Sequence, residues 1–191
     1  IQKRDWFMIA RNLIEKSINK HLLLLNTLNE DTYNLIEKAS DIFLETFSKK
    51  RTVFWCGNGG SASQANHLSA ELVGGMYKKK KSPLSSICLN SDTAFMTAWG
   101  NDVSFDHIFS RQLDALSVQG DILFVLTTSG NSNNIVEAAK FAKLHKIKVI
   151  SLTGNNGGQV KKYSDININV KSDDTQRIQE MHILIGHIIC D

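Results

Sequence analysis

A glycine-rich stretch, GNGGS at residues 57–61, directly follows an apolar, β-rich run and leads into a segment with helical periodicity. Glycines tolerate positive φ angles and let a ligand approach the backbone without meeting a Cβ atom. The start of the following helix offers free N–H groups and a partial positive charge. This junction is therefore typical of a loop that binds an anion.

A second stretch, TTSGNSNN at residues 127–134, has the same position between a strand and a helix. It places four hydroxyl groups around one glycine, on Thr127, Thr128, Ser129 and Ser132. Hydroxyls and backbone amides can coordinate a phosphate together, without a lysine or arginine in the loop. A turn followed by a helix cap would explain either loop alone, but the presence of both favours a phosphate site.

His67 and Glu71 lie four residues apart on the helix that leaves the glycine-rich loop, so they share one face. Such pairs are common on exposed surfaces, and spacing alone does not make them catalytic. Position 71, however, lies about 15 Å from the start of the helix at 1.5 Å per residue. That distance suits the far end of a phosphorylated sugar whose phosphate is held at the loops, which makes the pair a candidate for acid–base chemistry.

The last helical segment, 175–190, carries further acid–base candidates. Glu180 and His187 are seven residues apart and share a helix face better than Gln179 and His187 do. Periodicity therefore does not identify the functional pair. A histidine in this apolar segment, which also holds His182, is more often a core residue than a functional one.

The glycine-rich loop also satisfies the dinucleotide-binding pattern G-x-G-x-x-G/A through Gly57, Gly59 and Ala62. The acidic residue that this pattern requires about 20 residues later is missing, because residues 75–81 read GMYKKKK and Asp92 comes late. A hydroxyl-rich second loop is also foreign to that pattern. We therefore expect no organic cofactor.

Short β-rich runs alternate with helical segments from residue 52 onward, and this alternation must position the two loops. The runs are 52–56, 84–89, 121–127, 148–153 and 165–170, and the main helical segments are 61–77, 104–116, 132–145 and 175–190. The pattern predicts an α/β fold, a three-layer αβα sandwich with a central five-stranded parallel sheet. Ligands of such sheets bind beyond the carboxyl ends of the strands, where both loops would lie.

The first 50 residues have the periodicity of two helices that lie outside this sandwich. Apolar residues recur at helical spacing from Ile9 to Leu25, and a second stretch runs from Asp31 to Lys49, with Asp31 as a plausible N-cap. We expect one domain over residues 1–191, in which residues 1–50 serve packing or oligomer assembly.

The composition is that of an ordinary globular protein, with 42% hydrophobic and 21% charged residues. A net charge of +3 does not indicate nucleic-acid binding, and the run Lys78–Lys81 has no interleaved aromatic residues, so we interpret it as a solvated loop. No apolar run reaches the length of a membrane span. Three widely spaced cysteines without a C-x-x-C pair suit reduced thiols and a cytoplasmic location.

Several segments in order along the chain resemble the phosphoheptose isomerases of the SIS (sugar isomerase) domain family. They are CGNGGSASQANHLSAELVG, GNDVSFDHIFSRQLDAL, TTSGNSNNIVEA, SLTGNNGG and SDDTQRIQEMHILIGHIIC. The resemblance implies the SIS fold and the conversion of sedoheptulose 7-phosphate to D-glycero-D-manno-heptose 7-phosphate. That is the first step towards nucleotide-activated heptose for lipopolysaccharide or other surface glycans. It also implies a homotetramer with sites at the subunit interfaces.

The resemblance assigns roles to residues at matching positions. Phosphate would be held by Ser61, Thr127, Ser129 and Ser132, and the sugar would be contacted by Asn58, Gly59, Gly60, Glu71, Asn101, Asp102, Thr128 and Gln179. Glu71 would transfer the carbon-bound proton, and His187 would act at the oxygens. Thr127 stands where the family usually has serine, and Gln176 replaces a small or acidic residue.

Some members of the family bind one zinc ion per subunit, at positions that match His67, Glu71, Gln179 and His187. Glutamine is an uncommon zinc ligand. Zinc is therefore a possible cofactor that we do not require for proton transfer.

Two non-catalytic functions remain open at this point. One relative of similar sequence binds the bacterial replication initiator protein, and other SIS domains sense sugar phosphates. The first lacks residues equivalent to Glu71 and His187, whereas a sensor would need only the phosphate loops. Both residues are present here, which favours the enzyme.

Overall fold

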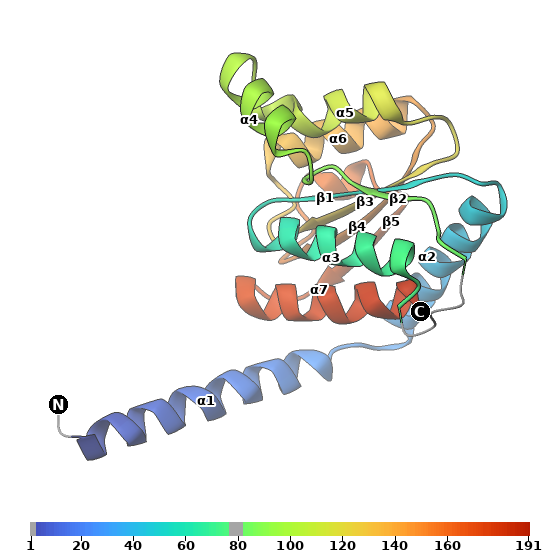
Figure 1. Cartoon of the computed structure of the whole chain (residues 1–191). Coiled ribbons are helices and arrows are strands. Elements are labelled where there is room, and N and C mark those ends of the chain that lie inside the picture. Colours follow the sequence, from blue (N-terminus) through green and yellow to red (C-terminus); the bar gives the residue numbers. More distant parts are fainter. Residues whose placement is uncertain (1–2, 77–81) are drawn as a thin grey trace.

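The computed structural model describes residues 3–76 and 82–191 and shows an α/β sandwich (Figure 1). The helices are α1 (Lys3–Leu25), α2 (Glu30–Ser48), α3 (Gly60–Gly74), α4 (Thr93–Asp102), α5 (Ile108–Leu116), α6 (Asn133–Leu144) and α7 (Thr175–Cys190), with 3-10 turns η1 (Phe105–His107) and η2 (Val160–Lys162). The strands are β1 (Val53–Gly57), β2 (Ser86–Cys88), β3 (Ile122–Thr127), β4 (Lys148–Gly154) and β5 (Ile166–Val170). They form one parallel sheet in the order β2-β1-β3-β4-β5, which confirms the predicted five-stranded sheet.

The three central strands β1, β3 and β4 are buried on both faces, and their alternate side chains enter two separate cores. Trp55 and Phe124 point into a core shared with α2, α3 and α7, whereas Phe54 and Leu123 point into one shared with α5 and α6. This alternation follows from the two-residue period of a strand. A parallel sheet covered by helices on both sides reads as continuous hydrophobic runs, as these strands do. The three-layer αβα arrangement is as predicted.

The structure corrects several local predictions. Helix α4 was not predicted: it has only 10 residues, none of which is buried, so it lacks the long apolar stripe of the other helices. The expected helix 104–116 is divided into η1 and α5. Asp31 is not the N-cap of α2: the side chain of Asn29 accepts a hydrogen bond from the backbone N–H of Thr32 at 3.1 Å, and Asp31 lies in the first turn. The helix dipole favours a carboxylate in the first turn as well as at the N-cap, so an acidic residue alone does not distinguish these two positions.

Helix α1 extends away from the sandwich and packs against it only near its C-terminal end (Figure 1). Its apolar side chains stay largely exposed, among them Ile9, Leu13, Ile14, Ile18, Leu22 and Leu23. Polar contacts join α1 to α7: Lys20 Nζ lies 2.9 Å from Asp174 Oδ2, and Arg177 Nη1 donates to the carbonyl of Ser17 at 2.7 Å. An amphipathic helix with an uncovered apolar stripe is consistent with the predicted packing role.

Within the described residues, no helix combines the length and the apolar character that crossing a bilayer requires. The lysine run at 78–81 lies outside the described residues, so its interpretation as a solvated loop stays a prediction.

Candidate active site

The sheet order places both predicted phosphate loops side by side. Strands β1 and β3 are hydrogen-bonded neighbours, with Gly57 opposite Leu126. The chain connects β1 to β2 on one side and continues from β3 to β4 on the other, so the strand order reverses between β1 and β3. Parallel α/β sheets bind ligands at such a switch point. A pocket of about 330 Å³ opens there, lined by residues 58–61 and 126–129, by Ser132, and by Thr175 and Gln179 of α7.

Two helices begin at this pocket, and no described side chain caps either of them. The N-cap of α3 is Gly59, at φ 56°, and the N-cap of α6 is Ser132. Uncapped helix N-termini leave N–H donors and a partial positive charge for a ligand. The pocket is therefore suited to an anion such as a phosphate.

The hydroxyl groups around the pocket differ in exposure. Ser61 and Thr127 are buried, whereas Ser129 is exposed. Thr127 Oγ1 accepts a hydrogen bond from the N–H of Gly130 at 3.1 Å, which fixes the turn at the start of the second loop. The hydroxyl of Thr127 thus lines the pocket and also holds the loop.

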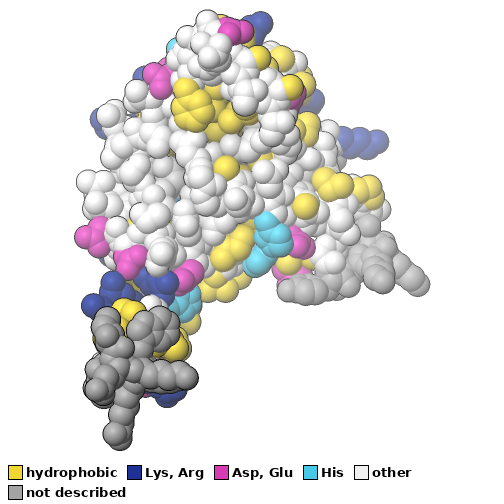
Figure 2. All heavy atoms as spheres, turned by 60° about the vertical axis from the view of Figure 1, so that its left-hand side comes forward, with side chains coloured by type: hydrophobic (Ala, Val, Ile, Leu, Met, Phe, Trp, Pro, Cys, Tyr) yellow, Lys and Arg dark blue, Asp and Glu magenta, His cyan; other side chains and the backbone are white. Residues whose placement is uncertain are grey.

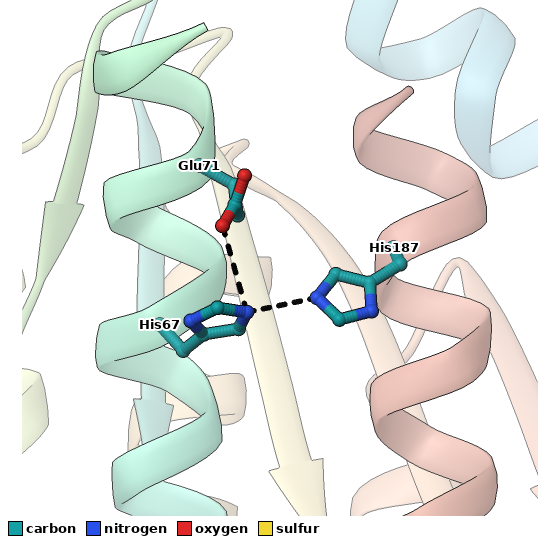
Figure 3. A group of neighbouring side chains, drawn as sticks. All are labelled: His67, Glu71 and His187. Carbon is teal, nitrogen blue, oxygen red and sulfur yellow. Dashed lines mark hydrogen bonds and ion pairs between the residues drawn. The ribbon is translucent and has the colours of Figure 1, made fainter. Parts of the chain in front are cut away.

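His67, Glu71 and His187 come together between α3 and α7 (Figure 3). His67 Nε2 lies 2.8 Å from His187 Nε2 and 3.6 Å from Glu71 Oε1. Two ring nitrogens at this separation must share a proton or a cation, because two lone pairs would repel each other. The three side chains could therefore exchange protons with a ligand or hold a metal ion.

The donor set of this cluster fits a zinc ion. One ligand atom from each residue, two imidazole nitrogens and one carboxylate oxygen, lies within 4.8 Å of the others. Three protein ligands of this kind with an open fourth position are typical of catalytic zinc sites. The cluster is also accessible, with the His67 side chain 48% exposed. Figure 2 shows histidine side chains at the surface beside hydrophobic and acidic ones.

Helices α3 and α7 approach closely because Gly186 faces Leu68. A Cβ atom on Gly186 would come within 2.5 Å of Leu68 Cδ1. The close approach brings His187 to His67, 120 residues away in sequence. Packing of the two helices thus creates the cluster that sequence spacing could only suggest.

The structure separates the two candidate pairs of the last helix. Glu180 faces α1, where its Oε2 lies 2.7 Å from His21 Nδ1, and its Oε1 lies 2.7 Å from Nη2 of Arg177 on its own helix. Gln179 faces the glycine-rich loop instead, so that a Cβ atom on Gly60 would meet its amide nitrogen at 2.7 Å. The better periodic match of Glu180 with His187 does not correspond to a contact between them.

Gln179 lies with the phosphate loops rather than with the three possible metal ligands. It precedes His187 by eight residues, about 12 Å along a helix. Its backbone carbonyl accepts a hydrogen bond from Gln64 Nε2 at 2.6 Å, which ties α7 to α3 at this level. Its place as a fourth zinc ligand stays a prediction.

His182 is the core histidine of the last helix. It is fully buried, and desolvation lowers its pKa to about 4, against a smaller opposing effect of the Thr153 backbone. His187 is half-buried and faces α3. The sequence-based expectation of a core histidine therefore applies to His182.

Asn101 and Asp102 lie at the C-terminal end of α4, exposed and outside the pocket lining. The amide of Asn101 donates to Asp102 Oδ1 at 2.7 Å. Neither residue lines the pocket, so their predicted contact with the sugar stays a prediction. Sequence reasoning in turn missed Thr175, which lines the pocket and could have been noticed as a hydroxyl at the start of the last helix.

All three cysteines are free and buried. Burial, reinforced by the Glu71 carboxylate, raises the pKa of the Cys190 thiol to about 12. Burial also raises the pKa values of Cys56 and Cys88. Burial therefore favours the protonated thiols near neutral pH, which disfavours them as nucleophiles.

Comparison with known proteins gives a consistent result. A family model described as "SIS domain" matches residues 18–154. The chain is 43% identical over 181 residues to a phosphoheptose isomerase from Helicobacter hepaticus, covering 95% of this chain and 91% of that protein. The fold matches the solved structure of a phosphoheptose isomerase from Neisseria gonorrhoeae with a TM-score of 0.89 and 35% identity, over 95% of this chain and 97% of the other. A phosphoheptose isomerase from Francisella tularensis matches with a TM-score of 0.87 and 36% identity, over 97% and 96%.

Proposed function

The chain belongs to the SIS domain family and, within it, to the phosphoheptose isomerases, and from this premise we propose how its residues isomerise sedoheptulose 7-phosphate in heptose biosynthesis. The main support for the proposal is that α3 and α7 contribute both to the anion pocket and to the cluster of His67, Glu71 and His187. The sugar would lie along these helices with its phosphate in the pocket and its carbonyl end towards Glu71.

The phosphate is held by the N-termini of α3 and α6 and by the hydroxyls around them. Ser61, Thr127, Ser129 and Ser132 all line the pocket. Binding energy from this remote group fixes the position of the reacting carbons, which is the usual use of a phosphate handle in catalysis. Asn58, Gly59, Gly60, Thr128 and Gln179 line the same pocket and would contact the sugar next to the phosphate.

The proton transfer is assigned to Glu71. Its carboxylate removes a proton from C1 of the open-chain ketose, the C1–C2 enediol forms, and the same carboxyl group returns the proton to C2 to give the aldose. His187 moves the proton between the two oxygens in step with this transfer. One carboxylate and one imidazole thus suffice for an intramolecular acid–base reaction.

His67, Glu71 and His187 would also hold a zinc ion. Gln179, whose amide lies beside Gly60, would have to turn towards them to act as the fourth predicted ligand. A bound zinc ion would polarise the carbonyl or hydroxyl oxygens of the sugar as a Lewis acid. A carboxylate shared with a metal is a weaker base than a free one, so we assign no obligatory step to the ion.

The test is turnover of sedoheptulose 7-phosphate by the parent protein, by Glu71→Gln and by Glu180→Gln, with bound metal quantified in each. We expect Glu71→Gln to lose about 100-fold or more in kcat with its fold retained, the usual contribution of a general base. Glu180→Gln removes a carboxylate of α7 that faces α1 instead of α3, so it should keep most of the turnover.

A folded parent without turnover, with or without added zinc, would refute this assignment. Full activity of Glu71→Gln would keep the assignment as an isomerase but would show that Glu71 does not transfer the proton. Binding of the sugar phosphate without turnover would instead favour a sensor.

We also propose a homotetramer with sites at subunit interfaces, working in the cytoplasm. The exposed apolar stripe of α1 supports assembly, and Asn101 and Asp102, exposed at the end of α4, would be available to a site shared with a neighbour. The free, buried thiols suit a reducing compartment. Light scattering that gives the mass of a monomer would contradict the tetramer.

A further inference from the structure

Two asparagines join the pocket's loops through a reciprocal pair of hydrogen bonds. Asn58 lies in the glycine-rich loop after β1, and Asn134 is the second residue of α6. Asn58 Nδ2 donates to Asn134 Oδ1 at 2.9 Å, and Asn134 Nδ2 donates to Asn58 Oδ1 at 2.9 Å. The pair connects residues 76 positions apart in the sequence. It is the kind of planar, two-bond contact that fixes orientation as well as distance.

The environment of Asn134 makes it the rigid member of the pair. Asn134 is only 2% exposed, whereas Asn58 is half-buried. Asn134 Oδ1 also accepts a hydrogen bond from the N–H of Ile135 at 2.9 Å. A buried carboxamide with both polar atoms engaged has little freedom to turn. Asn134 therefore offers Asn58 a fixed partner.

A second asparagine holds the same loop from the other side. Asn90, after β2, donates through Nδ2 to the carbonyl of Gly57 at 2.9 Å, and its Oδ1 accepts from the N–H of Gly57 at 3.2 Å. Gly57 has no room for a side chain, since a Cβ atom would come within 2.6 Å of the carbonyl carbon of Ser61. The glycine-rich loop is thus attached by carboxamides to the segment after β2 and to the first turn of α6.

We propose that Asn134 is a positioning residue, which acts through Asn58 to set the separation of the two loops so that one phosphate contacts both. The glycines allow the backbone of the first loop to adopt many conformations. Without the pair, the helix N-termini of α3 and α6 would no longer be held in one geometry around the anion. The inference rests on the proposed placement of the phosphate in the pocket.

The first measurement compares Asn134→Ala with the parent in turnover of sedoheptulose 7-phosphate and in inhibition by inorganic phosphate. We expect kcat/KM to fall about 10- to 100-fold, mainly through KM, because a misplaced binding group weakens the hold on the substrate. The inhibition constant of inorganic phosphate should rise in parallel. Asn133→Ala is the matched control, since Asn133 is the neighbouring asparagine but is exposed on α6, and it should leave both values unchanged.

A double-mutant cycle separates positioning from a merely structural role. If Asn134 acts through Asn58, then Asn134→Ala should have no further effect on KM in the Asn58→Ala background. Additive effects in the cycle would overturn the inference, and so would an unchanged KM in folded Asn134→Ala. An inactive parent would instead refute the proposed function, so the two failures are distinguishable.

Asn134→Asp covers the case in which the alanine variant does not fold. It preserves the volume and the acceptor for the N–H of Ile135, but it replaces the donor to Asn58 with a carboxylate oxygen that faces Asn58 Oδ1 and adds a negative charge beside the phosphate site. We expect a rise in KM at least as large as that of Asn134→Ala, which the Asn58→Ala background should reduce because the facing acceptor is gone. An effect of the same size in both backgrounds, or a protein that does not fold, would overturn the inference and make Asn134 a residue of the core alone.

Discussion

At the scale of single residues, the glycine-rich loop shows why a missing side chain can matter to a site. Gly60 leaves room for the amide of Gln179, whose nitrogen would lie 2.7 Å from an added Cβ atom. The neighbour is the flexible end of a side chain, so an added methyl group would displace the amide rather than disturb the backbone. Gly60 therefore couples the start of α3 to a side chain of α7.

This contact gives a prediction for Gly60→Ala. We expect kcat/KM to fall about tenfold or more, because Gln179 moves out of the pocket, while the free energy of unfolding changes by less than about 1 kcal/mol. Steady-state kinetics and urea unfolding measure the two effects.

Gly74→Ala is the control for that variant. An added Cβ atom at Gly74 meets nothing within 4 Å, so the protein should keep its activity and gain up to about 1 kcal/mol of helix stability. Equal activity of the two variants would show that Gln179 has no role at the loop.

At the scale of elements, the chemistry depends on how closely α3 and α7 pack. Both helices lie on the same face of the sheet and contribute to one core. The contact of Gly186 with Leu68 sets their separation, and this separation holds His67 and His187 at 2.8 Å. The site is therefore sensitive to changes that lie between the helices and touch no ligand.

Gly186→Ala tests this dependence. The added methyl group would overlap with Leu68, so we expect a loss of about 1–3 kcal/mol in unfolding free energy and weaker zinc binding by the separated histidines. Urea unfolding and metal titration measure these effects. In the Leu68→Ala background the overlap is gone, and the cost of Gly186→Ala should become smaller. An equal cost in both backgrounds would contradict the packing argument.

At the scale of the whole molecule, α7 is buried against the sheet and carries a titratable group into the core. Desolvation lowers the pKa of His182 to about 4 from an ordinary value of 6.5. The unfolded chain therefore binds a proton more readily than the folded one between these pH values. The contribution to stability is fully present above pH 6.5 and is lost as the pH falls towards 4.

The resulting prediction concerns stability in acid. A shift of this size corresponds to a loss of up to about 3 kcal/mol of unfolding free energy. Urea unfolding of the metal-free protein at pH 7.5 and pH 5 should show about 2 kcal/mol of this loss in the parent, because pH 5 lies about 1.5 units below 6.5, and a smaller loss in His182→Leu. His145→Gln, a change of an exposed histidine, should behave like the parent. The same loss in His182→Leu would assign the pH dependence to other groups.

The sequence by itself determined most of the elements, α4 excepted, and the positions of the two loops between strand and helix. The alternation of β-rich runs with helical segments, the glycine-rich loop at 57–61 and the hydroxyl-rich loop at 127–134 are local patterns, and local patterns follow from backbone geometry. They were sufficient to predict the parallel sheet and an anion site at its carboxyl edge. The family resemblance, borne out by the comparisons, added the reaction.

Only the tertiary structure decided which residues meet. Helical spacing favoured Glu180 as the neighbour of His187, but α7 turns Glu180 towards α1 and Gln179 towards Gly60. The helical period determines which residues of α7 share a face, but it does not say which neighbouring element each face packs against. Contacts such as His67 with His187 and Asn58 with Asn134 join distant parts of the chain. They exist because the strand order and the close packing of helices bring those parts together, and no local pattern contains that information.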